Sequence, residues 1–337
     1  MPCIPKTAKQ YLEVTNMKHS VKTRILSLML LALLSLSLLI GCQKQQEVYT
    51  VGICQLTQHV ALDAATQGFK DALVEALGED KVVFDEQNAS GDPAVCSTIA
   101  NSFVSKKVDL ILANATAALQ AAYNATTEIP ILGTSITEYG VALNLSDFNG
   151  VVGGNVSGTS DLAPLEQQAD MILELVPTAK KVGLLYCSAE PNSEYQVKVV
   201  EEYLTGKGLV CTRYAFTDTN DVAAVTTKAA ADSDVLYIPT DNTAATCTEA
   251  IGGIVRNAKV PVVAGEQGIC SGCGIATLSI SYYDLGYATG KMAARILTGE
   301  GDISQMPIEY APASKLYNVE MCEELGIVVP EGYEPLN

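Results

Sequence analysis

Histidine and positive charge are both scarce in this 337-residue sequence, and each shortage excludes a class of function. Two histidines and 21 Lys and Arg residues stand against 38 Asp and Glu residues, which gives a formal net charge of −17. Nucleic acids and anionic lipid surfaces attract clusters of basic residues. We therefore predict no nucleic-acid partner and no attachment to a membrane through charge.

The familiar catalytic motifs are also absent. The sequence has no Gly-x-Ser-x-Gly, no His-Glu-x-x-His, no phosphate loop ending in Gly-Lys-Ser/Thr and no Gly-x-Gly-x-x-Gly after its first predicted strand. Beyond the N-terminal leader described next, His59 is the one remaining histidine, so a Ser-His-Asp mechanism would have to use it. We predict a protein that is not an enzyme and that needs no cofactor.

A long apolar run near the N-terminus, residues Ile25–Gly41, follows several basic residues and ends in Leu-Ile-Gly-Cys at Cys42. This is the anatomy of an export signal that closes on a lipid-attachment cysteine. An uncleaved membrane helix is the alternative, and the run is of borderline length for one. We predict a leader and lipoprotein signal peptide over 1–41, a lipidated Cys42 and a polar tether over 42–47. One acyl chain anchors a protein only marginally, so several chains are expected on Cys42, which would hold the protein outside the cytoplasmic membrane.

Eight cysteines follow Cys42, most of them scattered along the chain. Outside the cell they could pair, but isolated cysteines in a chain of this size commonly serve as small buried hydrophobic residues. Cys270 and Cys273 form the one close pair, for which a local disulfide and two free thiols both remain open. A zinc site would want a second such pair or more histidines, so we predict no metal.

From Val48 onward, short apolar runs alternate with amphipathic stretches of helical period, which indicates an α/β fold with parallel sheets. Predicted strands are Tyr49–Cys54, Val82–Asp85, Leu110–Ala113, Ile129–Gly133, Val182–Tyr186, Val210–Ala215, Val235–Ile238 and Val260–Ala264. Predicted helices include Ala61–Leu77, Pro93–Ser105, Leu162–Leu175, Ser193–Thr205 and Asp221–Ala231. The glycine-rich stretch Gly150–Asp161 separates two similar halves and suits a hinge.

The C-terminal part of the sequence indicates that the chain crosses between the halves more than once. Gly274–Ser281 begins like another strand, and the helix Asp284–Thr298 is expected to return to the first half. We predict two Rossmann-like lobes, 48–157 with 280–306 and 158–279 with 307–337. The predicted hinge consists of Ser157–Asp161, Ser279–Tyr283 and Pro307–Pro312.

Polar residues gather just after the predicted strands, where open α/β sheets bind their ligands. The same positions are where helices need N-caps, so capping is the alternative role for Asp92, Asn114, Asn192 and Asp241.

Seven motifs in order along the chain resemble one family. They are Val51-Gly52-Ile53-Cys54-Gln55, His59 with Ala61-Leu62-Asp63, Gln87-Asn88-Ala89-Ser90-Gly91-Asp92, Ser157-Gly158-Thr159-Ser160-Asp161, Glu190-Pro191-Asn192-Ser193 with Gln196, Ile238-Pro239-Thr240-Asp241-Asn242, and Ala276-Thr277-Leu278 with Tyr282-Tyr283 and Leu285-Gly286-Tyr287. Together they resemble the substrate-binding lipoproteins of ABC importers of the tryptophan and tyrosine type. The resemblance implies a bilobed binding protein of the type I periplasmic kind, with three crossovers, that closes on a small ligand such as an aromatic amino acid. Departures at Val60, at Thr137-Glu138-Tyr139 and at the loop with Cys270 and Cys273 bear on the ligand more than on the fold.

A free amino acid needs partners for a carboxylate and for an ammonium group. We expect the helix start at Ser188–Ser193, with Ser188, Asn192 and Ser193, to receive the carboxylate, together with Thr116 in the first lobe. Asp241, with Glu266 behind it, is expected to take the ammonium group. Gln55 and His59 are expected to face the cleft and to flank an aromatic ring. The alternative for His59 is a polar residue at a helix start in solvent.

The function we predict is that of an extracytoplasmic solute-binding lipoprotein that hands an amino acid-like ligand to an ABC permease with its ATPase. A ligand-sensing receptor domain is the second hypothesis, weakened because no output segment follows Asn337. A lipid-anchored hydrolase is the third, and the missing nucleophile and base count against it.

Overall fold

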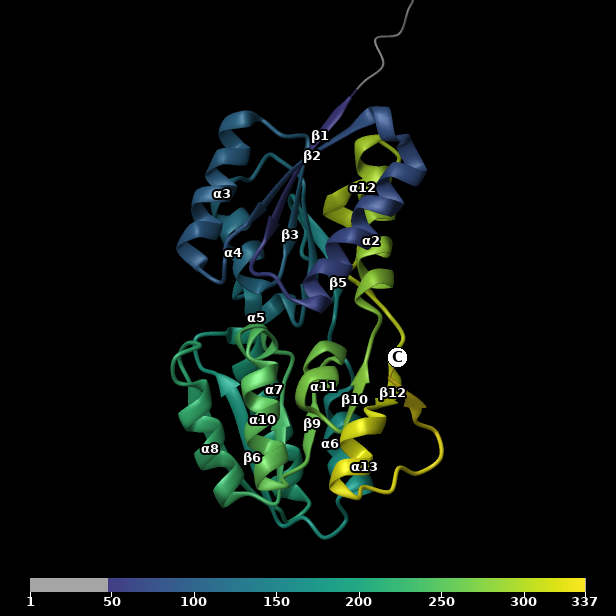
Figure 1. Cartoon of the computed structure of the whole chain (residues 1–337). Coiled ribbons are helices and arrows are strands. Elements are labelled where there is room, and N and C mark those ends of the chain that lie inside the picture. Colours follow the sequence, from purple (N-terminus) through teal and green to yellow (C-terminus); the bar gives the residue numbers. More distant parts are fainter. Residues whose placement is uncertain (1–47, 337) are drawn as a thin grey trace, which may run out of the picture. The chain divides into compact units, whose positions relative to one another are not determined.

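The computed structural model describes residues 48–336 (Figure 1). The predicted signal peptide, the lipidated Cys42 and the tether over 42–47 lie outside these residues. Within the described part of the chain, no helix combines the length and the apolar character needed to cross a bilayer.

The first lobe is built on a parallel sheet in the order β11-β5-β4-β3-β1-β2. Its strands are β1 (Tyr49–Gln55), β2 (Val82–Asn88), β3 (Leu110–Asn114), β4 (Ile131–Ile136), β5 (Val156–Ser160) and β11 (Glu309–Tyr310). Its helices are α2 (Val60–Leu77), α3 (Pro93–Lys106), α4 (Thr116–Ala125), α5 (Tyr139–Leu143) and α12 (Tyr282–Leu297), with short 3-10 turns at Glu79–Lys81 and Ile303–Gln305. Every residue of β3 and β4 is buried, as expected for parallel strands that carry helices on both faces.

The second lobe has a seven-stranded sheet in the order β13-β12-β10-β9-β8-β6-β7. Its strands are β6 (Lys181–Cys187), β7 (Val210–Phe216), β8 (Val235–Ile238), β9 (Val262–Ala264), β10 (Ala276–Ser279), β12 (Ser314–Tyr317) and β13 (Glu334–Pro335). Its helices are α6 (Leu165–Leu175), α7 (Pro191–Gly206), α8 (Val222–Asp232), α9 (Asn242–Thr246), α10 (Thr248–Ala258), α11 (Gln267–Cys273) and α13 (Val319–Leu325). The pairing of β10 with β12 is antiparallel, and the other pairings are parallel. The two sheets agree with the predicted α/β architecture of two similar units.

The second half of the glycine-rich stretch Gly150–Asp161, where the sequence had suggested a hinge, forms strand β5 of the first sheet. Gly158 in β5 has φ of +145°, and a Cβ atom there would lie 2.1 Å from the carbonyl oxygen of Gly133 in β4. Glycine is therefore required for strand packing at this point. Residues 158–160 and 309–310, which the prediction assigned to the second lobe, belong to the first sheet.

After β10 the chain returns to the first lobe as α12, which runs beside α2 in Figure 1. The two helices approach closely because they meet at small residues. A Cβ atom on Gly286 of α12 would lie 1.9 Å from the carbonyl oxygen of Ala65 in α2. This packing holds the return segment firmly on the first lobe.

The cysteines of the described part are all free thiols, and most of them are buried. Cys270 and Cys273 both lie in α11, where the Cys273 thiol donates a hydrogen bond to the carbonyl oxygen of Ile269 at 3.2 Å. The structure therefore corresponds to the free-thiol alternative for this pair.

Candidate ligand-binding cleft

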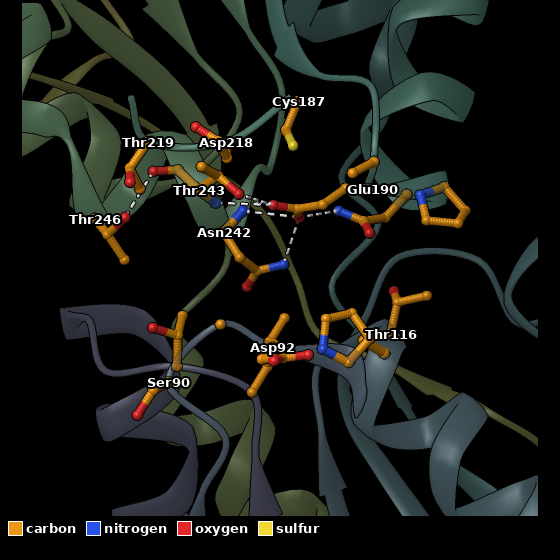
Figure 2. A pocket seen from close by; sticks show the side chains of 18 of the residues that line it. Ser90, Asp92, Thr116, Cys187, Glu190, Asp218, Thr219, Asn242, Thr243 and Thr246 are labelled. Carbon is orange, nitrogen blue, oxygen red and sulfur yellow. Dashed lines mark hydrogen bonds between the residues drawn. The ribbon is translucent and has the colours of Figure 1, made fainter. Parts of the chain in front are cut away.

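A cavity with a volume of about 640 Å³ takes its walls from both lobes (Figure 2). The first lobe contributes the segments after β1, β2 and β3, and the second lobe contributes those after β6, β7 and β8. We call this space the outer cavity. The carboxyl ends of parallel strands meet here, which is where open α/β sheets bind their ligands.

A second, much smaller space has a volume of about 10 Å³, which is enough for one group the size of a water molecule. Its lining residues are His59, Leu62, Ser135, Thr137, Asp161, Asn192, Thr240, Asp241, Asn242, Ala245, Glu266 and Tyr282. We call it the inner pocket. It shares Asn192 and Asn242 with the outer cavity, so the two spaces adjoin.

A direct contact joins the lobes beside these spaces. The ring atom Nε2 of His59, on the first lobe, lies 3.3 Å from the amide oxygen Oδ1 of Asn242, on the second. Glu190 fixes Asn242 in turn, because its carboxylate accepts hydrogen bonds from the backbone N–H of Asn242 at 3.0 Å and from Nδ2 at 2.7 Å. The same carboxylate accepts two more hydrogen bonds from Thr243, as Figure 2 shows.

Three buried carboxyl groups line the inner pocket. Burial raises the pKa of Asp161 to about 6 and that of Glu266 to about 7. Burial, together with the nearby charge of Glu190, raises the pKa of Asp241 to about 8. Among the described residues that line either space there is no Lys or Arg, so the cleft is suited to a ligand group with positive charge.

Asp241 and Glu266, which the sequence suggested as partners of an ammonium group, act as helix N-caps. Asp241 accepts hydrogen bonds from the backbone N–H of Ala244 at 2.8 Å and of Cys187 at 2.7 Å, one at each oxygen. Glu266 caps α11 by accepting from the N–H groups of Gly268 and Ile269. The oxygens of both residues are thus already engaged, which corresponds to the capping alternative for Asp241.

Three of the other predicted residues do not line either space. Gln55 is buried within the first lobe, where its amide donates to Asp63 and accepts from the Thr66 hydroxyl at 2.6 Å. The Ser188 hydroxyl donates to the carbonyl oxygen of Phe216, and Ser193 is a fully buried residue of the first turn of α7. The prediction that Gln55 faces the cleft is therefore corrected, because its side-chain amide is fully engaged in hydrogen bonds inside the first lobe.

His59, Thr116 and Asn192 do line the cleft. Thr116 begins α4, and Ala115 before it has φ of +87° and ψ of 160°, a conformation that is strained for any residue with a Cβ atom. Ala115 has no side-chain oxygen, so α4 begins without a side-chain cap, and its first residues Thr116 and Ala117 line the outer cavity. Strain of this kind gathers at ligand sites, where the surrounding structure enforces it.

Sequence reasoning missed several residues that line the cleft, of which Asp161, Ser135 and Glu190 matter most. Glu190 lies within the helix start Ser188–Ser193 but is not among the predicted ligand partners, and Asp161 follows β5, a strand that is not among those predicted from the sequence. Ser135 lies inside β4, and the sequence carries no sign of the irregularity that brings it to the pocket.

Comparison with known proteins identifies the family. The profile of the family described as ABC transporter substrate binding protein matches residues 50–333. The chain belongs to this family. A protein from Clostridioides difficile (strain R20291) named tyrosine-binding protein is 34% identical over 301 residues, which cover 83% of this chain and 86% of that protein. Proteins of this family bind solutes and act outside the cytoplasmic membrane, a role that involves no chemical conversion.

Two solved structures are similar over almost their whole length. The ABC domain from Streptococcus pneumoniae in complex with L-Trp has a TM-score of 0.80 at 31% identity, and the match covers 85% of this chain and 97% of that one. The ligand-free, open form of a substrate binding protein from Clostridium difficile has a TM-score of 0.66 at 35% identity, covering 86% and 100%. The fold is thus that of the type I periplasmic binding proteins, with two lobes. Despite its lower sequence identity, the L-Trp complex has the more similar structure.

Proposed function

We propose that this substrate-binding protein captures an amino acid with an aromatic side chain between its lobes and delivers it to an ABC permease with its ATPase. The observation that carries the proposal is the outer cavity, whose walls come from the strand ends of both lobes. Its volume of about 640 Å³ falls in the range of small-molecule sites. The names of two relatives, one tyrosine-binding and one in complex with L-Trp, support the choice of ligand.

The carboxylate of such a ligand has a partner in the first lobe. Thr116 and Ala117, at the uncapped start of α4, line the outer cavity. Backbone N–H groups at a helix start point toward an anion and carry the positive end of the helix dipole. Asn192 lines both spaces and extends the polar wall on the second lobe.

Capture works by closure of the lobes, and no reaction follows it. The His59 to Asn242 hydrogen bond and the greater similarity to the L-Trp complex support a closed arrangement here. A ligand drives closure only to the extent that it binds the closed form better than the open one. Residues of both lobes therefore have to contact the same ligand.

We further propose that the protein is exported and held at the cell membrane by lipid on Cys42. The apolar run that ends at this cysteine supports the proposal. Residues 42–47 would then serve as a short polar tether for the binding lobes.

A thermal-shift panel of the twenty amino acids, run on the protein without its leader, tests this function. A ligand at a hundred times its Kd adds about 2.7 kcal/mol to the free energy of unfolding. We expect L-tyrosine or L-tryptophan to raise Tm, and L-alanine and L-glutamate to leave it unchanged. A rise with none of the twenty would contradict the proposed function.

A further inference from the structure

Three polar atoms of the inner pocket have no partner among the described residues. They are Oδ1 of Asp161, Oγ of Ser135 and Nδ1 of His59, and all three are shielded from solvent. Asp161 and Ser135 are 5% and 6% exposed. A buried polar atom without a hydrogen bond costs about 1–3 kcal/mol, so three of them around one small space indicate a missing partner.

The hydrogen-bond network determines which role His59 Nδ1 plays. The Glu190 carboxylate can only accept, so the group of Asn242 that lies 2.7 Å from it is the donor Nδ2. The oxygen Oδ1 of Asn242 then faces the ring, and Nε2 of His59 must carry the proton and donate it. Burial lowers the pKa of His59, so the ring is neutral and Nδ1 is left as an acceptor.

Ser135 reaches the pocket through an irregularity in its strand. The register of β4 against β5 shifts between Gly133 and Ile136, and Ser135 between them has φ of +57°. A shift of this kind re-aims a side chain, and a non-glycine residue keeps such a conformation only where the structure enforces it.

Only one carboxylate oxygen of Asp161 has a hydrogen bond with a described residue. Its Oδ2 accepts a hydrogen bond from the Tyr282 hydroxyl at 2.8 Å, and the nearby Thr137 hydroxyl also stabilises the carboxylate, while Oδ1 has no hydrogen-bond partner among the described residues. The tyrosine thereby fixes the carboxylate, and the free oxygen remains available for a group that donates.

We propose that the inner pocket is a primary-ammonium subsite in which Asp161 Oδ1, His59 Nδ1 and Ser135 Oγ receive the three N–H donors of one –NH₃⁺ group. This proposal rests on the proposed function, in which the carboxylate and the side chain of the same ligand lie in the outer cavity. Glu190 is a positioning residue here, because it fixes the Asn242 amide that sets the tautomer of His59. The assignment replaces Asp241 as the partner of the ammonium group.

The size of the pocket makes the subsite selective. Room for one water-sized group fits –NH₃⁺, but it leaves no space for an added methyl or acetyl group. An acetylated nitrogen also loses its charge, which leaves Asp161 buried without a partner. A methylated amine is therefore disfavoured by size, and an acetylated nitrogen by both size and charge.

Calorimetry on the wild-type protein tests the subsite with four ligands based on tryptophan: L-tryptophan, N-acetyl-L-tryptophan, N-methyl-L-tryptophan and tryptamine. The corresponding set based on tyrosine serves if L-tyrosine is the better ligand. We expect the acetylated compound to bind at least about thirtyfold more weakly than the free amino acid. The methylated compound should also bind more weakly, and tryptamine, which keeps the ammonium group, should still bind.

A variant supplies the matching protein-side test. Asp161→Asn retains an oxygen for Tyr282 but places an NH₂ group in the inner pocket, so the affinity for L-tryptophan should fall by at least about thirtyfold. Asp80→Asn, an exposed aspartate remote from the cleft, should leave the affinity unchanged. Circular dichroism of both variants shows whether they fold, and the ligand series on the wild type decides the matter if Asp161→Asn does not.

The outcomes separate the subsite from the function. Equal binding of L-tryptophan and its N-acetyl derivative would overturn the subsite and leave amino acid capture standing. Binding of tryptamine but of no amino acid would overturn the proposed function while supporting the subsite. Binding of none of these compounds, nor of the tyrosine series, would overturn both.

Discussion

His59 Nε2 and Asn242 Oδ1 lie 3.3 Å apart and join the two lobes, although the two residues are 183 positions apart in the chain. The contact has a defined direction, because Glu190 holds the other end of the Asn242 amide. One hydrogen bond thus contributes to lobe closure and also determines which nitrogen of His59 is free to accept from a ligand.

Replacing Asn242 with alanine removes this contact between the lobes. A hydrogen bond of this kind contributes about 0.5–1.5 kcal/mol, so affinity for the amino acid should fall by up to about tenfold. Asn257→Ala, at an exposed position of α10, is the matched control and should bind normally. Calorimetry on the two variants makes the comparison, and unchanged affinity of Asn242→Ala would show that the contact does not assist closure.

Asp241→Asn should weaken the fold. Both oxygens of Asp241 accept backbone N–H groups, whereas an asparagine offers one oxygen and turns an NH₂ group toward the second donor. We expect a loss of about 1–3 kcal/mol in the free energy of unfolding, measured by urea titration. Asp221→Asn is the control, since Asp221 stands at the start of α8 but its side chain does not cap that helix. Equal stability of the Asp241 variant and the wild type would argue against the capping role.

The stability of the ligand-free protein should decrease from pH 5 to pH 8. The pKa values of Asp161, Glu266 and Asp241 rise to about 6, 7 and 8, above ordinary values near 4 in the unfolded chain. Between these limits the folded protein binds more protons than the unfolded one, so raising the pH favours unfolding. Scanning calorimetry across this range should show a falling Tm. A Tm that rises steadily with pH would mean that these carboxyl groups are not buried as described.

Ligand affinity should show the opposite trend around pH 6, because the ammonium group requires an ionised Asp161. Asp241, Glu266, Tyr282 and His59 share the inner pocket with it, and burial lowers the pKa of His59, which favours the neutral ring. Affinity for L-tryptophan or L-tyrosine should therefore increase as the pH rises from 5 to 7.5. The Asp161→Asn variant should show a weaker dependence, because only Glu266 and Asp241, with pKa values of about 7 and 8, then titrate in the pocket. A wild-type affinity that is constant over the range would count against Asp161 as the partner of the ligand.

Cys42→Ala should release the protein from the membrane. The chain beyond this cysteine is strongly acidic, so no electrostatic attachment replaces the lipid. Fractionation of cells that express the variant should place it in the soluble extracytoplasmic fraction. A variant that stays on membranes with its apolar run intact and the binding lobes exposed outside would indicate a spanning helix.

Much of the fold could be predicted from the sequence, because parallel strands buried on both faces are continuous apolar runs. The runs at Leu110–Ala113 and Val235–Ile238 are examples, and both are strands. The stretch before Asp161 was less predictable, because a glycine required for close strand packing has the same appearance as a glycine in a flexible hinge. Only the neighbouring strand, with Gly133, distinguishes the two.

The cleft could be predicted in part. The position of a residue after a strand correctly places Thr116 and Asn192 at the cleft, but it does not say whether an acid there is free or already used. Asp241 and Glu266 cap helices by accepting hydrogen bonds from backbone N–H groups, whereas Asp161 has one oxygen without a hydrogen-bond partner among the described residues. Which of these carboxylates has a free oxygen depends on contacts between residues that are far apart in the chain, and such contacts are not evident from local sequence.

The most direct test of amino acid capture between the lobes is isothermal titration calorimetry of the protein without its leader, with L-tyrosine and L-tryptophan. Protein that has been unfolded and refolded should be used, so that no ligand is carried through purification. We predict one binding site per chain, filled by at least one of the two amino acids. The absence of measurable binding of either amino acid to correctly refolded protein would contradict the account.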